Sequence, residues 1–190
     1  MFQNKKKNWR TKRAPKLDEN GEPIKREIEP AKARKLTMQR AVKLLAAKPR
    51  SIGELRGKLL EKDWTNEEIV SEVLAKLEDY KFLDDAQYAE LYASFNVRQK
   101  PQGKRLLQQK LALKKIDKET AQNALEKVFE ETPEDELLER ALEKRLRSKG
   151  VPSTREDFKK LYDYLLRQGF SYDLISNRLR GIKQEDFEVE

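Results

Sequence analysis

Cysteine and histidine are both missing from this chain of 190 residues, and glycine and proline occur only seven times each. Without cysteine there is no disulfide framework, no thiolate nucleophile and no zinc site of the usual kind. Without histidine, the Ser-His and Cys-His nucleophile systems are excluded. The longest apolar run, Leu44 to Ala47, is far shorter than the ~20 residues that span a bilayer. We therefore expect a soluble intracellular protein that needs no cofactor, enters no membrane and acts by binding.

Positive charge is concentrated at the N-terminus. Residues 1–35 carry 12 − 5 = +7, whereas residues 36–190 carry 30 − 29 = +1. The first segment has little apolar periodicity and cannot bury enough surface to offset the entropy of ordering, so we predict a flexible, disordered basic arm over 1–35. Its cations, with Trp9 available to stack on a base, suit a polyanion; a solubilising tail is the alternative. The candidate contacts in the arm are Lys5, Lys6, Lys7, Arg10, Lys12 and Arg13.

From Leu36 onward the chain reads as helix, because good helix formers dominate and apolar residues recur three or four apart. One apolar pattern occurs three times, at offsets of 52 and then 54 residues. The aligned positions are Leu55, Leu107 and Leu161; Leu59, Leu111 and Leu165; Trp64, Ile116 and Phe170; Ile69, Ala121 and Ile175; and Val73, Leu125 and Leu179. We predict an all-α fold of three tandem three-helix repeats over 36–82, 84–130 and 133–183, followed by an acidic tail over 184–190. Because short helices bury their stripes only against each other, we expect an elongated, curved molecule.

Polar residues and prolines separate the predicted helices. Ser51 with Glu54 fits a capping box, in which the hydroxyl and the carboxylate each accept a hydrogen bond from a backbone amide of the first turn. Thr65 with Glu68 fits another. Further candidate caps are Asp84, Asp85, Asp117, Thr132, Ser153 and Ser171. Three apolar residues stand at the position of a hydrophobic staple, and we interpret them as structural: Trp64, Ile116 and Phe170.

Asp84 and Asp85 are the residues that most resemble a catalytic site. Two adjacent carboxylates can bind Mg²⁺, so a metal-dependent carboxylate enzyme is one hypothesis. However, the pair also begins a helix, where an aspartate caps backbone amides and interacts favourably with the helix dipole. We favour capping, and we assign no catalytic, cofactor-binding or metal-binding residue.

Two basic clusters lie within the repeats. One surrounds Pro101 and Gly103, and the other lies on the predicted first helix of the third repeat. Such side chains bind phosphates or acidic protein surfaces, although a solvated face of mixed charge is the alternative. The candidate contacts are Arg98, Lys100, Lys104 and Arg105 in the first cluster and Lys144, Arg145, Arg147 and Lys149 in the second.

Three stretches carry a resemblance to a known family. They are Arg50-Ser51-x-x-Glu54-Leu55-x-x-x-Leu59, Leu77-x-x-Tyr80-x-Phe82-Leu83-Asp84-Asp85-x-x-Tyr88-Ala89 and Gly103-x-x-x-Leu107-x-x-x-Leu111. Together with the tandem repeats over 36–183, they resemble the RecX family of recombinase regulators. This family usually has a glycine in the turn after the second helix of a repeat, but here only Gly169 keeps it, and Asp63 and Lys115 replace it.

The resemblance implies a non-enzymatic modulator of the RecA recombinase. Such a protein binds along the helical groove of the RecA–DNA filament and limits filament growth, ATP hydrolysis and strand exchange. The resemblance further implies a monomeric protein of the bacterial cytoplasm, with the recombinase filament and single- or double-stranded DNA as partners. The rival hypothesis is a general basic DNA- or RNA-binding protein that acts through its arm. It predicts salt-dependent, sequence-independent binding that disappears when residues 1–35 are removed.

Overall fold

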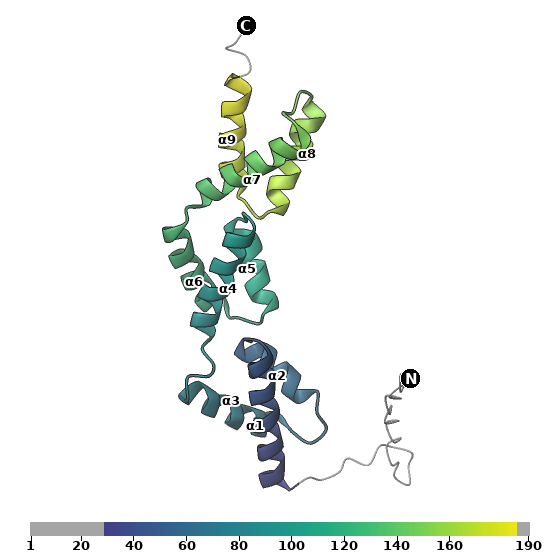
Figure 1. Ribbon diagram of the computed structural model, residues 1–190, viewed down its shortest axis with the longest axis vertical. Coiled ribbons are helices and arrows are strands. Elements are labelled where there is room, and N and C mark those ends of the chain that lie inside the picture. The colour runs from purple at the N-terminus through teal and green to yellow at the C-terminus, as the bar shows by residue number, and fades with distance from the viewer. Residues whose placement is uncertain (1–28, 186–190) are drawn as a thin grey trace, which may run out of the picture.

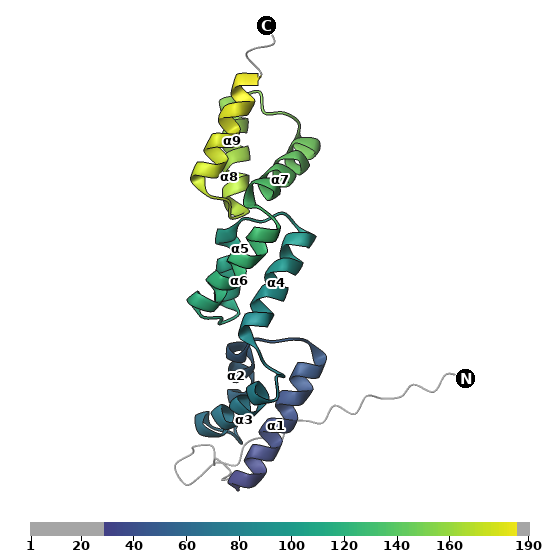
Figure 2. The ribbon, with the colours of Figure 1, turned by 90° about the vertical axis from the view of Figure 1, so that its left-hand side faces the viewer.

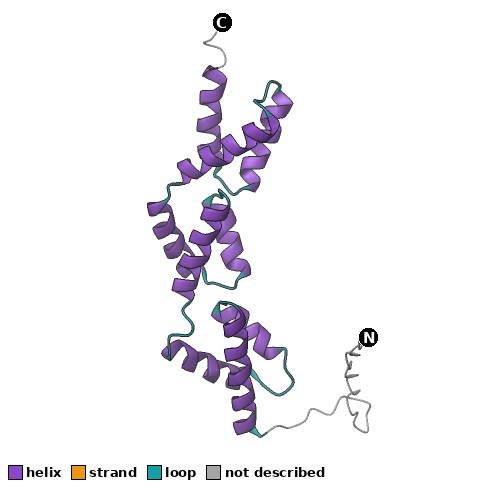
Figure 3. Cartoon of the chain, in the orientation of Figure 1, coloured by secondary structure: helices purple, strands orange, loops and turns teal. Residues whose placement is uncertain are grey.

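The computed structural model describes residues 29–185, and their side chains as far as Arg180. The first repeat contains α1 (Pro30–Ala47), α2 (Ile52–Leu60) and α3 (Glu67–Asp79). The second contains α4 (Asp85–Gln99), α5 (Lys104–Leu113) and α6 (Lys118–Glu131). The third contains α7 (Glu134–Lys149), α8 (Arg155–Arg167) and α9 (Tyr172–Glu185). Helices are the only regular elements in this range, which confirms the predicted all-α fold of three three-helix repeats (Figure 3).

The three repeats follow one another along the long axis of the molecule (Figures 1 and 2). The first repeat lies at one end, and α9 reaches the other. Among the described residues, hydrogen bonds join the first repeat to the second and the second to the third, as expected of a tandem array. The molecule is therefore elongated. Among the described helices, none is both long and apolar enough to cross a bilayer.

The ends of the array differ from the predicted boundaries. The predicted arm covers residues 1–35, but α1 already begins at Pro30. Proline suits the first position of a helix because its fixed φ is helical and its missing amide hydrogen is not needed there. Ala33 is buried, and Arg34 Nε donates to Glu72 Oε2 at 2.5 Å, so both residues belong to the first repeat. At the other end, α9 continues to Glu185, past the predicted start of the tail at 184.

Several helices begin with a side chain that accepts a hydrogen bond from an amide of the first turn. The accepting side chains and donating amides are Ser51 and Glu54, Asp84 and Gln87, Asp117 and Thr120, and Ser171 and Leu174. The carboxylate of Glu54 does not complete the predicted capping box with Ser51. Instead it accepts a hydrogen bond from Lys114 Nζ at 2.9 Å, which ties the first repeat to the second.

Three candidate caps lie one residue away from the cap position. The residues at that position are Asn66 instead of Thr65, Thr154 instead of Ser153, and Pro133 instead of Thr132. In the first two cases neighbouring side chains have the same capping chemistry, so sequence alone does not choose between them. At the third, Thr132 ends α6 and α7 has no side-chain cap.

Ile116 and Phe170 are buried at turns that end one helix and begin the next. Their amides donate to the carbonyls of Leu111 and Leu165, five residues earlier. The preceding residues, Lys115 and Gly169, have positive φ angles of 60° and 92°. This is the Schellman pattern that closes a helix. The two apolar residues thus occupy the staple position of the following helix as well.

The corresponding turn in the first repeat is built differently. Asp63 does not have a positive φ, and the helix cap Asn66 comes two residues after Trp64 rather than one. Trp64 is only partly buried, and Lys62 Nζ lies 5.7 Å from the centre of its ring. The longer turn removes the need for a left-handed residue, which is why aspartate replaces glycine there without strain.

Lys81, which follows α3, also has a positive φ of 60°, and its side chain is exposed. A β-carbon in this conformation costs about 1–2 kcal/mol, part of which the greater chain entropy of glycine offsets. We expect Lys81→Gly to raise the free energy of unfolding by about 0.5–1 kcal/mol, as measured by urea denaturation. Lys81→Ala removes the same charge but keeps the β-carbon; an equal gain from alanine would refute the role of strain.

Buried apolar side chains form two separate clusters in the part of the chain that is described. One belongs to the first repeat and includes Leu55 and Leu59. The other is continuous through the second and third repeats and includes Leu107, Leu165 and Phe170. The second and third repeats therefore share a core, whereas the first repeat has its own and is joined to the second by hydrogen bonds, such as those of Ser51 and Asp85.

The second helices of the repeats, α2, α5 and α8, meet end to end (Figure 1). Ser51 Oγ, at the start of α2, donates to the carbonyl of Lys114 at the end of α5. The amide of Gly103, at the start of α5, donates to the carbonyl of Gln168 at the end of α8 at 2.9 Å. Each joint brings a helix C-terminus against a helix N-terminus, so partial charges of opposite sign meet.

Candidate partner-binding surfaces

Asp84 and Asp85, the candidate acidic pair, both accept hydrogen bonds from backbone amides. Asp84 Oδ1 accepts from the amide of Gln87, in its own helix, at 2.9 Å. Asp85 Oδ1 accepts from the amide of Ile52, the first residue of α2, at 2.8 Å. Asp85 therefore caps a helix of the preceding repeat rather than its own. Burial raises the pKa of Asp85, while the hydrogen bond from Ile52 opposes this effect.

We expect Asp85→Asn to keep most of the stability at neutral pH, because its amide oxygen can still accept from Ile52 and the buried charge is removed. We expect Asp85→Ala to lower the free energy of unfolding by about 1 kcal/mol, since it leaves that amide without a partner. The raised pKa of Asp85 has a second consequence. Protonation of Asp85 favours the folded state, so the free energy of unfolding of wild type should rise relative to that of Asp85→Asn as the pH falls through this pKa. Urea denaturation at several pH values measures both effects.

The first predicted basic cluster spans the end of α4 and the beginning of α5. Arg98, Lys100 and Arg105 are exposed, and Lys104 is partly buried. Near them, Lys110 Nζ donates to Gln102 Oε1 at 2.6 Å and to Asn96 Oδ1 at 2.9 Å. Burial, and then the positive charge of Lys100, lower the pKa of Lys110. Positive charges therefore lie close together here.

The N-terminus of α5 is not itself an open anion site. The amide of Lys104 donates to Glu134 Oε1 at 2.9 Å, and the preceding amide of Gly103 donates to a carbonyl of the third repeat. A phosphate at this cluster would therefore meet the side chains of Arg98, Lys100 and Arg105, not the helix terminus.

The second predicted basic cluster lies on the C-terminal half of α7. Lys144, Arg147 and Lys149 are exposed. Arg145 has a structural contact, because its guanidinium carbon lies 4.9 Å from the centre of the Tyr164 ring. A pocket of about 320 Å³ beside this helix is lined by Arg145 and Lys149, together with other residues of α7, α8 and the loop between them.

The candidate cations in these two clusters share one electrostatic property. The ion pairs among the described residues engage other cations, such as Arg56 with Glu67 and Lys58 with Glu61. None of them involves the candidate contacts Arg98, Lys100, Lys104, Arg105, Lys144, Arg145, Arg147 or Lys149. Their charge is therefore available to an external anion. The candidate contacts in the arm, Lys5, Lys6, Lys7, Arg10, Lys12 and Arg13, lie outside the described residues.

A further surface, not identified from the sequence, lies on α4. This helix buries its small residues Ala89 and Ala93, together with Val97. Its large side chains lie on another face, at the spacing i, i+3, i+4 and i+7: Tyr88, Leu91, Tyr92 and Phe95. Leu91 is 64% exposed and Phe95 is 62% exposed. The rings of Tyr88 and Tyr92 stack at 5.9 Å between centres.

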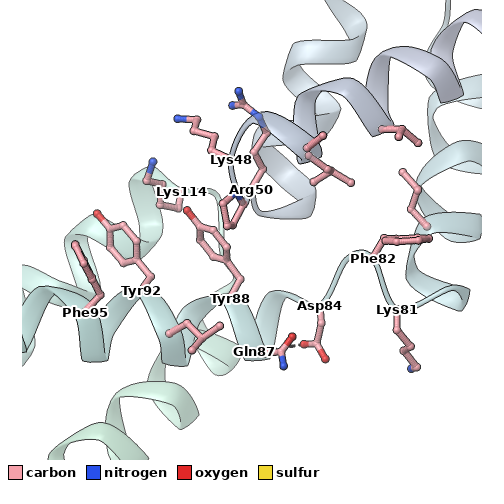
Figure 4. A pocket seen from close by; sticks show the side chains of 16 residues that line it. Lys48, Arg50, Lys81, Phe82, Asp84, Gln87, Tyr88, Tyr92, Phe95 and Lys114 are labelled. Atoms are coloured by element: carbon pink, nitrogen blue, oxygen red, sulfur yellow. Dashed lines mark hydrogen bonds between the residues drawn. The ribbon is translucent and has the colours of Figure 1, made fainter.

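These α4 side chains form one wall of a groove of about 790 Å³ between the first and second repeats, which we call the α1–α4 groove (Figure 4). Val42 and Leu45 of α1 and Phe82, after α3, also line it. Lys48, Arg50 and Lys81 contribute positive charge. The periodicity of α4 could have identified the stripe, but not which side of the helix its neighbours would cover.

Comparison with known proteins gives the same three repeats. Three family models match the chain in order. The model described as "RecX, first three-helix domain" matches residues 38–77, "RecX, second three-helix domain" matches 84–125, and "RecX, third three-helix domain" matches 133–177. The crystal structure of RecX from Lactobacillus salivarius matches with a TM-score of 0.71 and 27% identity, over 81% of this chain and 99% of that one.

The regulatory protein RecX of Bacillus velezensis is 33% identical over 153 residues, and that of Bacillus subtilis is 32% identical over 149 residues. These alignments cover 80% and 78% of this chain but 57% and 56% of the relatives. The chain thus spans little more than half the length of these relatives. The three matched domains, in order, together with the matching crystal structure, show that the chain belongs to the RecX family of regulatory proteins.

Proposed function

We propose that this chain regulates a RecA-type recombinase by binding along the recombinase–DNA filament. There it limits filament growth, ATP hydrolysis and strand exchange. The main support is that the candidate cations of α4, α5 and α7 take part in no ion pair within the described residues. Such charges attract the phosphates of DNA or an acidic protein surface. We propose that the protein acts as a monomer in the bacterial cytoplasm.

The shape of the molecule supports a long partner. The stacked repeats form one extended surface, so different repeats can contact the same long partner at several points. In this proposal the protein acts by binding, and it binds through the exposed cations of α4, α5 and α7. Asp84 and Asp85 serve as caps, so we assign them no part in catalysis.

The test is the single-strand-dependent ATPase of the cognate recombinase, measured as this protein is added. DNA is kept in excess, so that simple competition for DNA is weak. The 190-residue chain is compared with a variant that lacks residues 1–28. This deletion leaves α1 intact, whereas a deletion to residue 35 would remove Ala33 and Arg34 from the first repeat.

We expect both forms to inhibit the ATPase when they are substoichiometric to the recombinase. That result would place the activity in the repeats. Inhibition that occurs only when DNA is limiting, and is lost with residues 1–28, would refute the proposal. It would identify a general basic nucleic-acid-binding protein that acts through its N-terminal segment.

A further inference from the structure

Large apolar side chains line the α1–α4 groove and remain exposed there, so they are not needed to fill the core. α4 packs against α6 and buries its alanines, and its stripe of large side chains lines the groove, with Leu91 and Phe95 exposed and Tyr88 and Tyr92 partly buried. Helices of globular proteins usually turn such a stripe inward. Contiguous exposed apolar surface of this kind usually marks an interaction site. The exposed fractions of Leu91, Phe95 and Phe82, at 64%, 62% and 69%, show that the described residues leave this surface uncovered.

We propose that the α1–α4 groove binds an acidic amphipathic helix of a partner protein. We infer that the partner is acidic because the groove has positive side chains at its edges. Lys48 and Arg50 lie near Tyr88 and Tyr92 at one side of the groove, and Lys81 lies toward the other end (Figure 4). None of the three cations is in an ion pair with a described residue.

The other charged groups of the groove are already engaged. Lys114 Nζ donates to Glu54 Oε1 at 2.9 Å, and it lies 5.8 Å from the centre of the Tyr92 ring. Asp84, the one acid in the lining, accepts from the amide of Gln87. The unpaired charge of the groove is therefore positive, and carboxylates on a bound segment would complement it.

The walls of the groove favour a helix over an extended segment. An extended peptide gains affinity by pairing its backbone with the edge of a sheet, whereas α1 and α4 use their own backbone groups within each helix. A bound helix satisfies its own backbone and needs only side-chain contacts. The spacing of Tyr88, Leu91, Tyr92 and Phe95 covers about two helical turns, which suits the apolar stripe of a second helix.

A second copy of this chain is a poorer occupant. Residues 1–35 of a second copy carry +7 and its residues 36–190 carry +1, so it offers no excess of negative charge to complement a positive groove. The α1–α4 groove is separate from the two basic clusters, and binding of a helix there does not depend on the proposed action on a recombinase. Either could fail while the other holds.

The test uses three labelled synthetic peptides and measures their binding to the 190-residue chain by fluorescence anisotropy. The first is a helix of about 16 residues with leucine at i, i+3, i+4 and i+7 positions and glutamate at most others. The second replaces the glutamates with lysine, and the third replaces the leucines with serine. We expect the first to bind at least about tenfold more tightly than the other two.

Variants of the protein locate the binding site. Leu91→Ser/Phe95→Ser should weaken binding of the first peptide by about tenfold or more. Since both side chains are exposed, the substitutions should leave the fold intact, which circular dichroism checks. Leu113→Ser is the matched control, because Leu113 is 81% exposed and lies outside the groove. Lys48→Gln/Lys81→Gln should weaken binding in low salt and have little effect in high salt.

Equal affinity for the acidic and basic peptides would overturn the proposal, as would binding that survives Leu91→Ser/Phe95→Ser. Sedimentation of the protein alone provides the remaining outcome. Self-association that disappears in the Leu91→Ser/Phe95→Ser variant, but not in Leu113→Ser, would show that a second copy covers the groove, and the proposed partner would be wrong.

Discussion

Gly103→Ala is expected to lower the free energy of unfolding by about 2–3 kcal/mol, because it forces apart the joint between the second and third repeats. A β-carbon at this position would lie 2.4 Å from the carbonyl carbon of Gly169 and 2.5 Å from the amide nitrogen of Phe170. Both are backbone atoms, so the neighbouring turn must move. That movement also strains the hydrogen bond from the Gly103 amide to Gln168. Urea denaturation followed by circular dichroism measures the loss.

Gly57→Ala is the control for this substitution. A β-carbon at Gly57 would meet only Lys115 Nζ, at 3.0 Å, and the end of a lysine side chain can move away. Gly57 lies inside α2, where alanine should stabilise the helix by about 0.5–1 kcal/mol. The two substitutions are therefore expected to have opposite signs. A loss of similar size in both would mean that the contact with Gly169 and Phe170 is not what destabilises Gly103→Ala, and no loss from Gly103→Ala would mean that the joint tolerates a β-carbon.

Substitution of the exposed cations of α7 is expected to weaken DNA binding at least about tenfold in low salt. The variant is Lys144→Gln/Arg147→Gln/Lys149→Gln. If each residue contacts one phosphate, the slope of log affinity against log salt should become shallower by about 2–3. Arg145 is left unchanged because of its contact with Tyr164. Fluorescence anisotropy with labelled DNA at several salt concentrations provides both quantities.

The matched control replaces three cations that are already in ion pairs. In Arg56→Gln/Lys58→Gln/Lys127→Gln, the residues changed have Glu67, Glu61 and Glu90 as their partners. Both variants lose three positive charges, so a general effect of net charge would lower the affinity equally in each. We expect the control to keep near wild-type affinity and salt dependence. Equal losses would show that the position of the α7 cations is unimportant.

The repeat register shows how far the sequence predicts this fold. Offsets of 52 and 54 residues placed Leu55, Leu107 and Leu161 in equivalent positions, and all three are buried. The offset fails in the third helix of the first repeat. Counted from the caps Asn66 and Asp117, the residue equivalent to Ala121 is Val70, not Ile69. Both Ile69 and Val70 are buried, so hydrophobicity alone could not reveal a turn that is one residue longer.

The candidate binding surfaces, too, could be predicted from the sequence only in part. Clusters of lysine and arginine are visible in a sequence, and the structure shows that the described ones lack acidic partners. The role of Asp85 was only half visible. Its acidity predicted a cap, but the amide that it caps belongs to Ile52, 33 residues earlier. The α1–α4 groove was missed because periodicity reports that a stripe exists on α4, while contacts with other helices decide whether it is covered.

The end-to-end contacts of α2, α5 and α8 give the molecule a direction. At each joint the C-terminus of one second helix meets the N-terminus of the second helix in the preceding repeat, and never the reverse. The two ends of the array are therefore unlike, and no rotation exchanges them. A partner that is itself a polar polymer would distinguish the two ways of laying this protein along it.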